Sequence, residues 1–114
     1  MGPADALTQL TELSSQVEDA AILGESGFVL ASTGTPERGE ELARVAADLL
    51  AVAADVRRDG PAVTRVEVAF PGGSLFVVRE DGRTAVATTV PAPTAGLVVY
   101  DLRTALRRLA EGDG

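Results

Sequence analysis

Acidic pairs are the first residues in this chain that could do chemistry. Glu40 and Glu41 are adjacent, and so are Glu80 and Asp81. Two neighbouring carboxylates act as an acid and a base only when a shared cleft raises the pKa of one of them, and a hard cation needs several convergent oxygens. The first pair falls in the opening turn of a predicted helix and the second at a predicted hairpin tip, where water solvates both. We therefore expect neither a catalytic nor a metal role for them.

Nucleophilic chemistry lacks its usual partners in this chain. The sequence contains no histidine, no cysteine and no lysine, and all ten of its cations are arginines. A serine without a neighbouring base remains a weak nucleophile. The glycine-containing segments at residues 24–27 and 71–73 are not followed by Lys-Ser or Lys-Thr, so hairpin turns explain them better than a phosphate-binding loop. The sequence predicts a protein that is not an enzyme and that carries no cofactor and no metal.

The size and charge of the chain set further limits. Its 114 residues suit a single domain, residues 1–114, and such a domain buries roughly 60 to 70% of its unfolded surface. A formal net charge of -7 opposes binding to nucleic acid and to anionic lipid. Asp48 and Asp55 interrupt the one long apolar stretch, and the amino terminus lacks the charged-then-apolar layout of a signal peptide. We expect a cytoplasmic protein with no nucleic-acid or membrane partner.

Apolar spacing predicts the first elements. Residues 6–17 place apolar side chains three and four positions apart, as in an amphipathic helix. Two short apolar runs follow, residues 20–24 and 28–32, and the glycine turn between them predicts a β-hairpin. Neither run alternates cleanly, so we expect helices to cover both faces of this part of the sheet. The predicted buried face of the first helix consists of Leu7, Leu10, Leu13 and Val17.

The second predicted helix, residues 36–57, has two apolar faces. Glutamates near its start and two arginines at its end suit the helix dipole. Its core-facing stripe is predicted to consist of Leu42, Val45, Ala46, Leu49, Ala53 and Val56. Beside that stripe runs a second one, here called the alanine stripe, which consists of Ala43, Ala47, Leu50, Ala51 and Ala54.

The alanine stripe has two interpretations. Alanine is the best helix former, so the stripe could be a surface of no importance. Alternatively, small side chains let another helix approach closely, and an apolar stripe beside the core stripe needs a cover. The simplest cover is the same helix of a second copy, because twofold symmetry makes one patch complementary to itself. We favour the second interpretation, which predicts a homodimer.

Three further strands and a closing helix complete the pattern. The strands lie within residues 63–90, parted by turn residues, and a helical pattern opens near Gly96. If the strand at residues 63–70 lies at the sheet edge, its Arg65 and Glu67 either protect that edge or pair with Glu67 and Arg65 of a partner strand. The sequence leaves these two alternatives open. The predicted element order is α-β-β-α-β-β-β-α.

These segments resemble the roadblock/dynein light chain family, in the bacterial group of regulators of Ras-like GTPases. The resemblance spans nearly the whole chain and is most telling at residues 27–32, Gly-Phe-Val-Leu-Ala-Ser, and at Gly96-Leu97. It implies an α/β (α+β) fold of roadblock/profilin-like type, in which a five-stranded antiparallel sheet has one long helix on one face and two terminal helices on the other. It also implies a homodimer joined through the third strand and the second helices.

Two functions remain open at this point. The first is a non-enzymatic homodimeric scaffold or regulator of a small Ras-like GTPase, a role that the resemblance implies and the alanine stripe supports. Such a regulator orders the switch segments of the GTPase or lends an arginine, and the sequence does not single out one among Arg38, Arg57 and Arg58. The alternative is a small-molecule sensor of profilin-like or PAS-like outline. Its polar candidates are Tyr100, Thr88 and Arg79.

Overall fold

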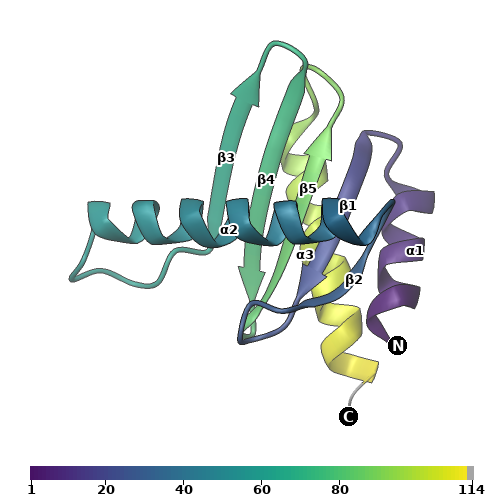
Figure 1. Ribbon diagram of the computed structural model, residues 1–114, viewed down its shortest axis with the longest axis horizontal. Helices are drawn as coiled ribbons and strands as arrows, with labels where there is room; N and C mark the ends of the chain where they lie inside the picture. The colour runs from purple at the N-terminus through teal and green to yellow at the C-terminus, as the bar shows by residue number, and fades with distance from the viewer. Residues whose placement is uncertain (113–114) are drawn as a thin grey trace.

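A five-stranded antiparallel sheet in the order β2-β1-β5-β4-β3 lies at the centre of the computed structural model, which describes residues 1–112 (Figure 1). One long helix, α2, crosses one face of the sheet, and the terminal helices α1 and α3 cover the other. The predicted five-stranded antiparallel sheet, the predicted placement of the helices and the predicted element order are therefore confirmed. The elements are α1 (Pro3–Leu13), β1 (Val17–Leu23), β2 (Val29–Ser32), α2 (Pro36–Val56), β3 (Arg65–Phe70), β4 (Gly73–Glu80), β5 (Arg83–Thr89) and α3 (Ala95–Gly112).

The central strands are buried on both faces, as their unbroken apolar runs predict. In β1, Ala20 and Ile22 pack toward α1 and α3, whereas Ala21 and Leu23 pack toward α2. Successive side chains of a strand point to opposite faces, so the sheet divides the interior into two cores. We call the smaller one the α2-side core, and it consists of Ala21, Leu23, Leu42, Ala46, Leu75, Val77 and Val86.

The Asp81-Gly82 turn sets the register between β4 and β5. Both residues have positive φ, 53° and 79°, as a two-residue hairpin turn of type I′ requires. Glycine adopts this conformation freely and aspartate tolerates it. Glu80 consequently pairs with Arg83, and the ladder continues along both strands.

Helix α1 lies earlier in the chain than its spacing predicts. It begins at residue 3 and ends at Leu13, where the N–H of Ser14 donates to the carbonyl of Leu10 at 2.9 Å. Val17, predicted on the buried face of this helix, instead opens β1 and pairs with Thr89. Leu13, predicted on the same face, is 69% exposed. The prediction was wrong here because a β-branched residue four positions after Leu13 fits a helix stripe and a strand equally well.

Helix α2 ends at Val56, one residue before the predicted end, and its buried stripe is rotated from the predicted one. A Cβ at Gly39 would lie 2.6 Å from Ser32 Oγ, so only glycine lets the helix come this close to β2. This close approach turns Val45, predicted in the core, partly outward, and it is 41% exposed. The residues of α2 that are buried are Gly39, Leu42 and Ala46.

The far end of α2 continues past β3, the last strand of the sheet (Figure 1). Its 21 residues make a helix about 32 Å long, whereas about 19 Å separates the outer two of five strands. Val56, also predicted in the core, therefore has no sheet beneath it and is 78% exposed. Val52, one turn earlier in the helix, is 66% exposed. We call residues 52–58, which are the last residues of α2 and the two residues that follow it, the overhang.

Candidate interface on strand β3 and helix α2

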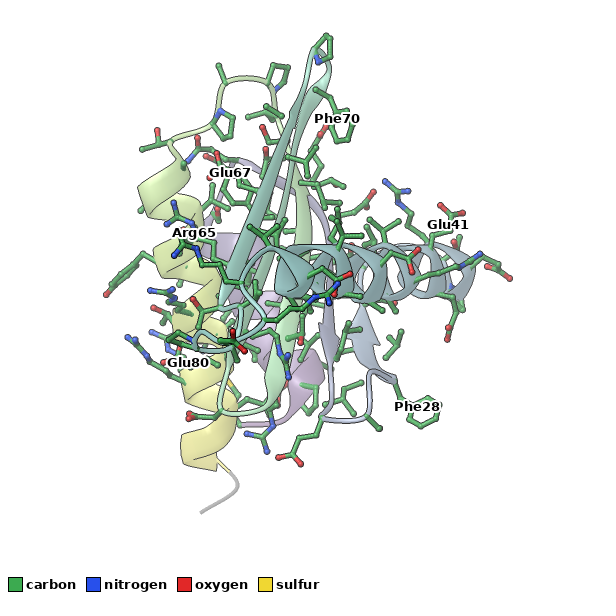
Figure 2. All side chains as sticks on the ribbon, turned by 90° about the vertical axis from the view of Figure 1, so that its left-hand side faces the viewer. Phe28, Glu41, Arg65, Glu67, Phe70 and Glu80 are labelled. Carbon is green, nitrogen blue, oxygen red and sulfur yellow. The ribbon has the colours of Figure 1, made fainter. Side chains whose placement is uncertain are left out.

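Strand β3 is an edge of the sheet, and it carries both charged residues predicted for an interface. It pairs with β4 alone, and no strand within residues 1–112 covers its other side. Arg65 and Glu67 are exposed, and Figure 2 shows both side chains on the α3 side of the sheet. Phe70 points to the opposite side, toward α2, and is 59% exposed. The backbone of this edge is therefore able to pair with a strand of another molecule.

The α2 side of β3 is apolar throughout. Val66 packs against the α2-side core, Val68 is half-buried, and Phe70 completes the row. These three residues share one face because successive side chains of a strand point to opposite faces. A strand added to this edge would meet apolar side chains on one face and the charged pair on the other.

The alanine stripe lies on the flank of α2 that faces the turn between β1 and β2. Ala43 and Leu50 are half-buried and pack against the α2-side core. A hollow of about 160 Å³ lies between this flank and residues 24–27 of the turn. The chain thus covers part of the stripe itself and leaves three members exposed, namely Ala47, Ala51 and Ala54.

The opposite flank of α2 carries larger apolar side chains, and sequence reasoning assigned three of them, Val45, Leu49 and Val56, to the core. Val45, Val52 and Val56 are exposed, and Leu49 between them is half-buried against the α2-side core. Their spacing of four, three and four residues is that of a seam between two helices. We call these four residues the valine flank. One signal in the sequence could have revealed it, because a helix of this length is too long for five strands.

A groove of about 450 Å³ runs between Val45, at one end of the valine flank, and the Phe70 end of β3. The rim of the groove is charged. Arg38 Nε lies 3.3 Å from Asp19 Oδ2, and Arg38 Nη1 lies 3.1 Å from Glu41 Oε2. Glu18 adds a third carboxylate, so the rim holds three acids and one base. The apolar part of the lining comes from Leu42, Val45, Phe70 and Leu75.

The polar residues considered for a small-molecule site are not brought together. Thr88 lines the groove, Arg79 lies at the other end of β4, and Tyr100 is an exposed residue of α3. The arginines considered for a GTPase are also separated, because Arg38 lies in the first turn of α2 and Arg57-Arg58 follows its last turn. The geometry therefore brings neither set of residues together.

The carboxylates of the acidic pairs are exposed to solvent or bonded to an arginine. Glu40 and Glu41 are exposed near the start of α2. Glu80 accepts a hydrogen bond from Arg107 Nε at 2.8 Å, and this bond raises the pKa of Arg107 above its ordinary value. Among the residues that the structure describes, no group of three or more acidic, histidine or cysteine side chains could hold a metal ion. No helix in the described part of the chain has the length and apolar character that a bilayer span requires.

Several solved structures share the fold of this chain. A Roadblock/LC7 domain from Streptomyces avermitilis matches with a TM-score of 0.84 at 19% identity, over 97% of this chain and 97% of its own. The gliding protein MglB from Thermus thermophilus matches with a TM-score of 0.74 at 18% identity, over 96% of this chain and 89% of its own. An MglB structure with a tetrameric arrangement matches with a TM-score of 0.75 at 19% identity, over 94% and 86%. At these identities the matches establish the fold.

Sequence comparison identifies the family. No curated protein matches the chain. The family model of the Roadblock/LC7 domain matches residues 3–88, which run from the start of α1 into β5. The matched residues include α2 and β3, the two elements that carry the candidate interface. The chain belongs to the Roadblock/LC7 domain family, as its sequence resemblance indicates.

Proposed function

We propose that this protein is a non-enzymatic, homodimeric scaffold or regulator of a small Ras-like GTPase. Membership of the Roadblock/LC7 family and the resemblance to bacterial GTPase regulators support this role. The observation that carries the homodimer is the valine flank, an apolar seam beside an unpaired edge strand. Contiguous exposed apolar surface of this kind marks an interaction site.

The second copy joins by pairing its β3 with this β3, antiparallel, across a twofold axis. Helix α2 crosses β3 near the start of the strand (Figure 1), where Val66 packs against the α2-side core. Two packed helices need about 8–10 Å between their axes. A twofold axis through Val66, the register that pairs Arg65 with the partner's Glu67, would superpose the two helices. An axis through Val68 instead separates them by four residues along the strand, about 13 Å, so it is the first register on this side that admits both helices without overlap.

Side-chain pairing favours the axis through Val68 as well. It sets Val66 opposite the partner's Phe70, so the apolar face of the edge strand continues across the axis. On the other face it sets Glu67 opposite the partner's Ala69. An axis through Glu67 would oppose two like charges and leave only about 7 Å between the helices.

In this dimer the valine flank forms the contact between helices. The axis lies on the Phe70 side of α2, and the valine flank faces that side. The alanine stripe faces away, so its exposed alanines are available to a different partner. Two adjacent α2 helices form one platform, and we place the GTPase on it because small side chains let a partner approach the helix backbone closely.

Light scattering tests the homodimer. The full chain should run at twice its protomer mass of 11.7 kDa at micromolar concentration. A monomer at that concentration would refute the proposal.

Co-purification tests the GTPase partner. The GTPase encoded nearest to this gene, loaded with GDP or with a GTP analogue, should be retained by the immobilised protein, and retention of neither form would refute the role. Ala51→Glu, on the alanine stripe, should weaken capture without changing the mass of the dimer. Ala4→Glu, an exposed position of α1, is the matched control and should leave capture unchanged.

A further inference from the structure

We infer that the overhang of α2 completes the groove of a second copy, so that Arg57 and Arg58 of one chain bind the acidic rim of the other. The inference rests on the proposed homodimer and states what each copy contributes to its partner. Twofold symmetry produces the contact twice in each dimer.

The overhang is a helix end that its own sheet does not support. The last turns of α2 extend past β3 (Figure 1), and Val52 and Val56 in these turns are exposed. Arg58 Nε lies 3.9 Å from Asp55 Oδ1, at the outer limit of an ion pair, and both side chains are largely exposed. Arg57 forms no ion pair with any residue that the structure describes. The overhang therefore offers two apolar side chains and two guanidinium groups to another molecule.

The groove offers the complementary surface. Its apolar lining includes Val45 and Phe70, both partly exposed in the single chain. The carboxylates of Glu18, Asp19 and Glu41 exceed the single cation of the rim, Arg38, by two charges. A segment that carries apolar side chains and then cations therefore matches the groove, because the apolar side chains fit its lining and the cations fit its acidic rim.

Dimer geometry brings the two surfaces together. Six residues separate Leu50, which packs on the α2-side core, from Val56, and six residues of helix rise about 9 Å. Neighbouring strands are about 4.8 Å apart, so an overhang that extends past its own β3 passes over the partner's β3. The axis through Val68 sets the overhang on the Phe70 side of the partner's α2, which is the side of the groove. Long arginine side chains then extend to the rim.

A charge swap between two variants of the full chain tests this contact. One variant carries Arg57→Glu and Arg58→Glu, and the other carries Glu18→Arg and Glu41→Arg. Each homodimer then opposes like charges at both symmetric sites, and its dissociation constant should rise about 10- to 100-fold. In an equimolar mixture, the reversed overhang meets the reversed groove and the second site keeps its native charges. The heterodimer should therefore form with nearly the wild-type affinity.

Native mass spectrometry identifies the heterodimer, and sedimentation velocity measures each dissociation constant. Arg44→Glu combined with Arg103→Glu makes the same change in net charge as Arg57→Glu with Arg58→Glu, but outside the groove and the overhang, and should dimerise like the wild type. Swap variants whose homodimers remain as tight as the wild type would overturn the inference while leaving the homodimer in place. A mixture that fails to restore heterodimer would overturn it in the same way. A wild-type monomer would instead refute the homodimer itself.

Discussion

Replacement of Val52 by aspartate should prevent self-association at micromolar concentration. Val52 is 66% exposed in the single chain and lies in the middle of the valine flank. Full burial of a valine contributes about 1.5 kcal/mol, so covering two-thirds of it contributes about 1 kcal/mol per copy and about 2 kcal/mol per dimer. An unpaired carboxylate in the same seam loses hydration, which costs at least about 2 kcal/mol more. The dissociation constant should rise about thirtyfold from the first effect and about a thousandfold from both.

Sedimentation velocity over a range of concentrations measures this constant. Ala54→Asp is the matched control, because Ala54 is exposed on the alanine stripe of the same helix and the substitution adds the same charge. Both variants should keep the helical circular dichroism of the wild type, since neither side chain is buried in the single chain. If Ala54→Asp separates the dimer and Val52→Asp leaves it intact, the alanine stripe is the self-association face and our assignment of the two flanks is refuted.

Two further substitutions test the packing and the turns, and urea unfolding measures both. Gly39→Ala places a Cβ 2.6 Å from Ser32 Oγ and should destabilise the fold by about 1–3 kcal/mol, whereas adding Ser32→Gly should recover most of that loss. A Gly39→Ala variant as stable as the wild type would contradict the close approach of α2 to β2. Gly82→Ala, at a φ of 79°, should destabilise by about 1–2 kcal/mol, and an equal effect from Asp81→Asn would argue against the type I′ turn.

Local signals in the sequence predict the elements of this fold well. Proline and glycine punctuate the chain between the strands, and Asp81-Gly82 specifies a hairpin through its backbone preference alone. Cleanly alternating residues, such as those of β3, correctly indicate which side chains share a face. The position of β3 at the edge was left open, because strand order depends on pairing between residues far apart in the chain.

The buried face of each helix was predicted less well than the type of each element, and α2 shows why. Apolar residues occupy more than half of its circumference, so periodicity alone does not say which of them meets the sheet. The rotation of the helix is decided by Gly39, whose missing Cβ admits Ser32, and that contact joins two separate elements. Val45 consequently leaves the predicted core. The valine flank was missed through this rotation, although the excess length of the helix was visible in the sequence.

Helix propensity makes the difference between the two flanks of α2 informative. Alanine is the best helix former, so the exposed alanines at positions 47, 51 and 54 are explained without any partner. Valine is β-branched, loses side-chain freedom in a helix and stabilises it less than alanine by about 0.5 kcal/mol. Three exposed valines therefore weaken the free helix and also expose apolar surface, two of them where no sheet supports it. A cover over the valine flank offsets both costs. The second copy thus contributes most at the overhang, where the helix of a single chain is weakest.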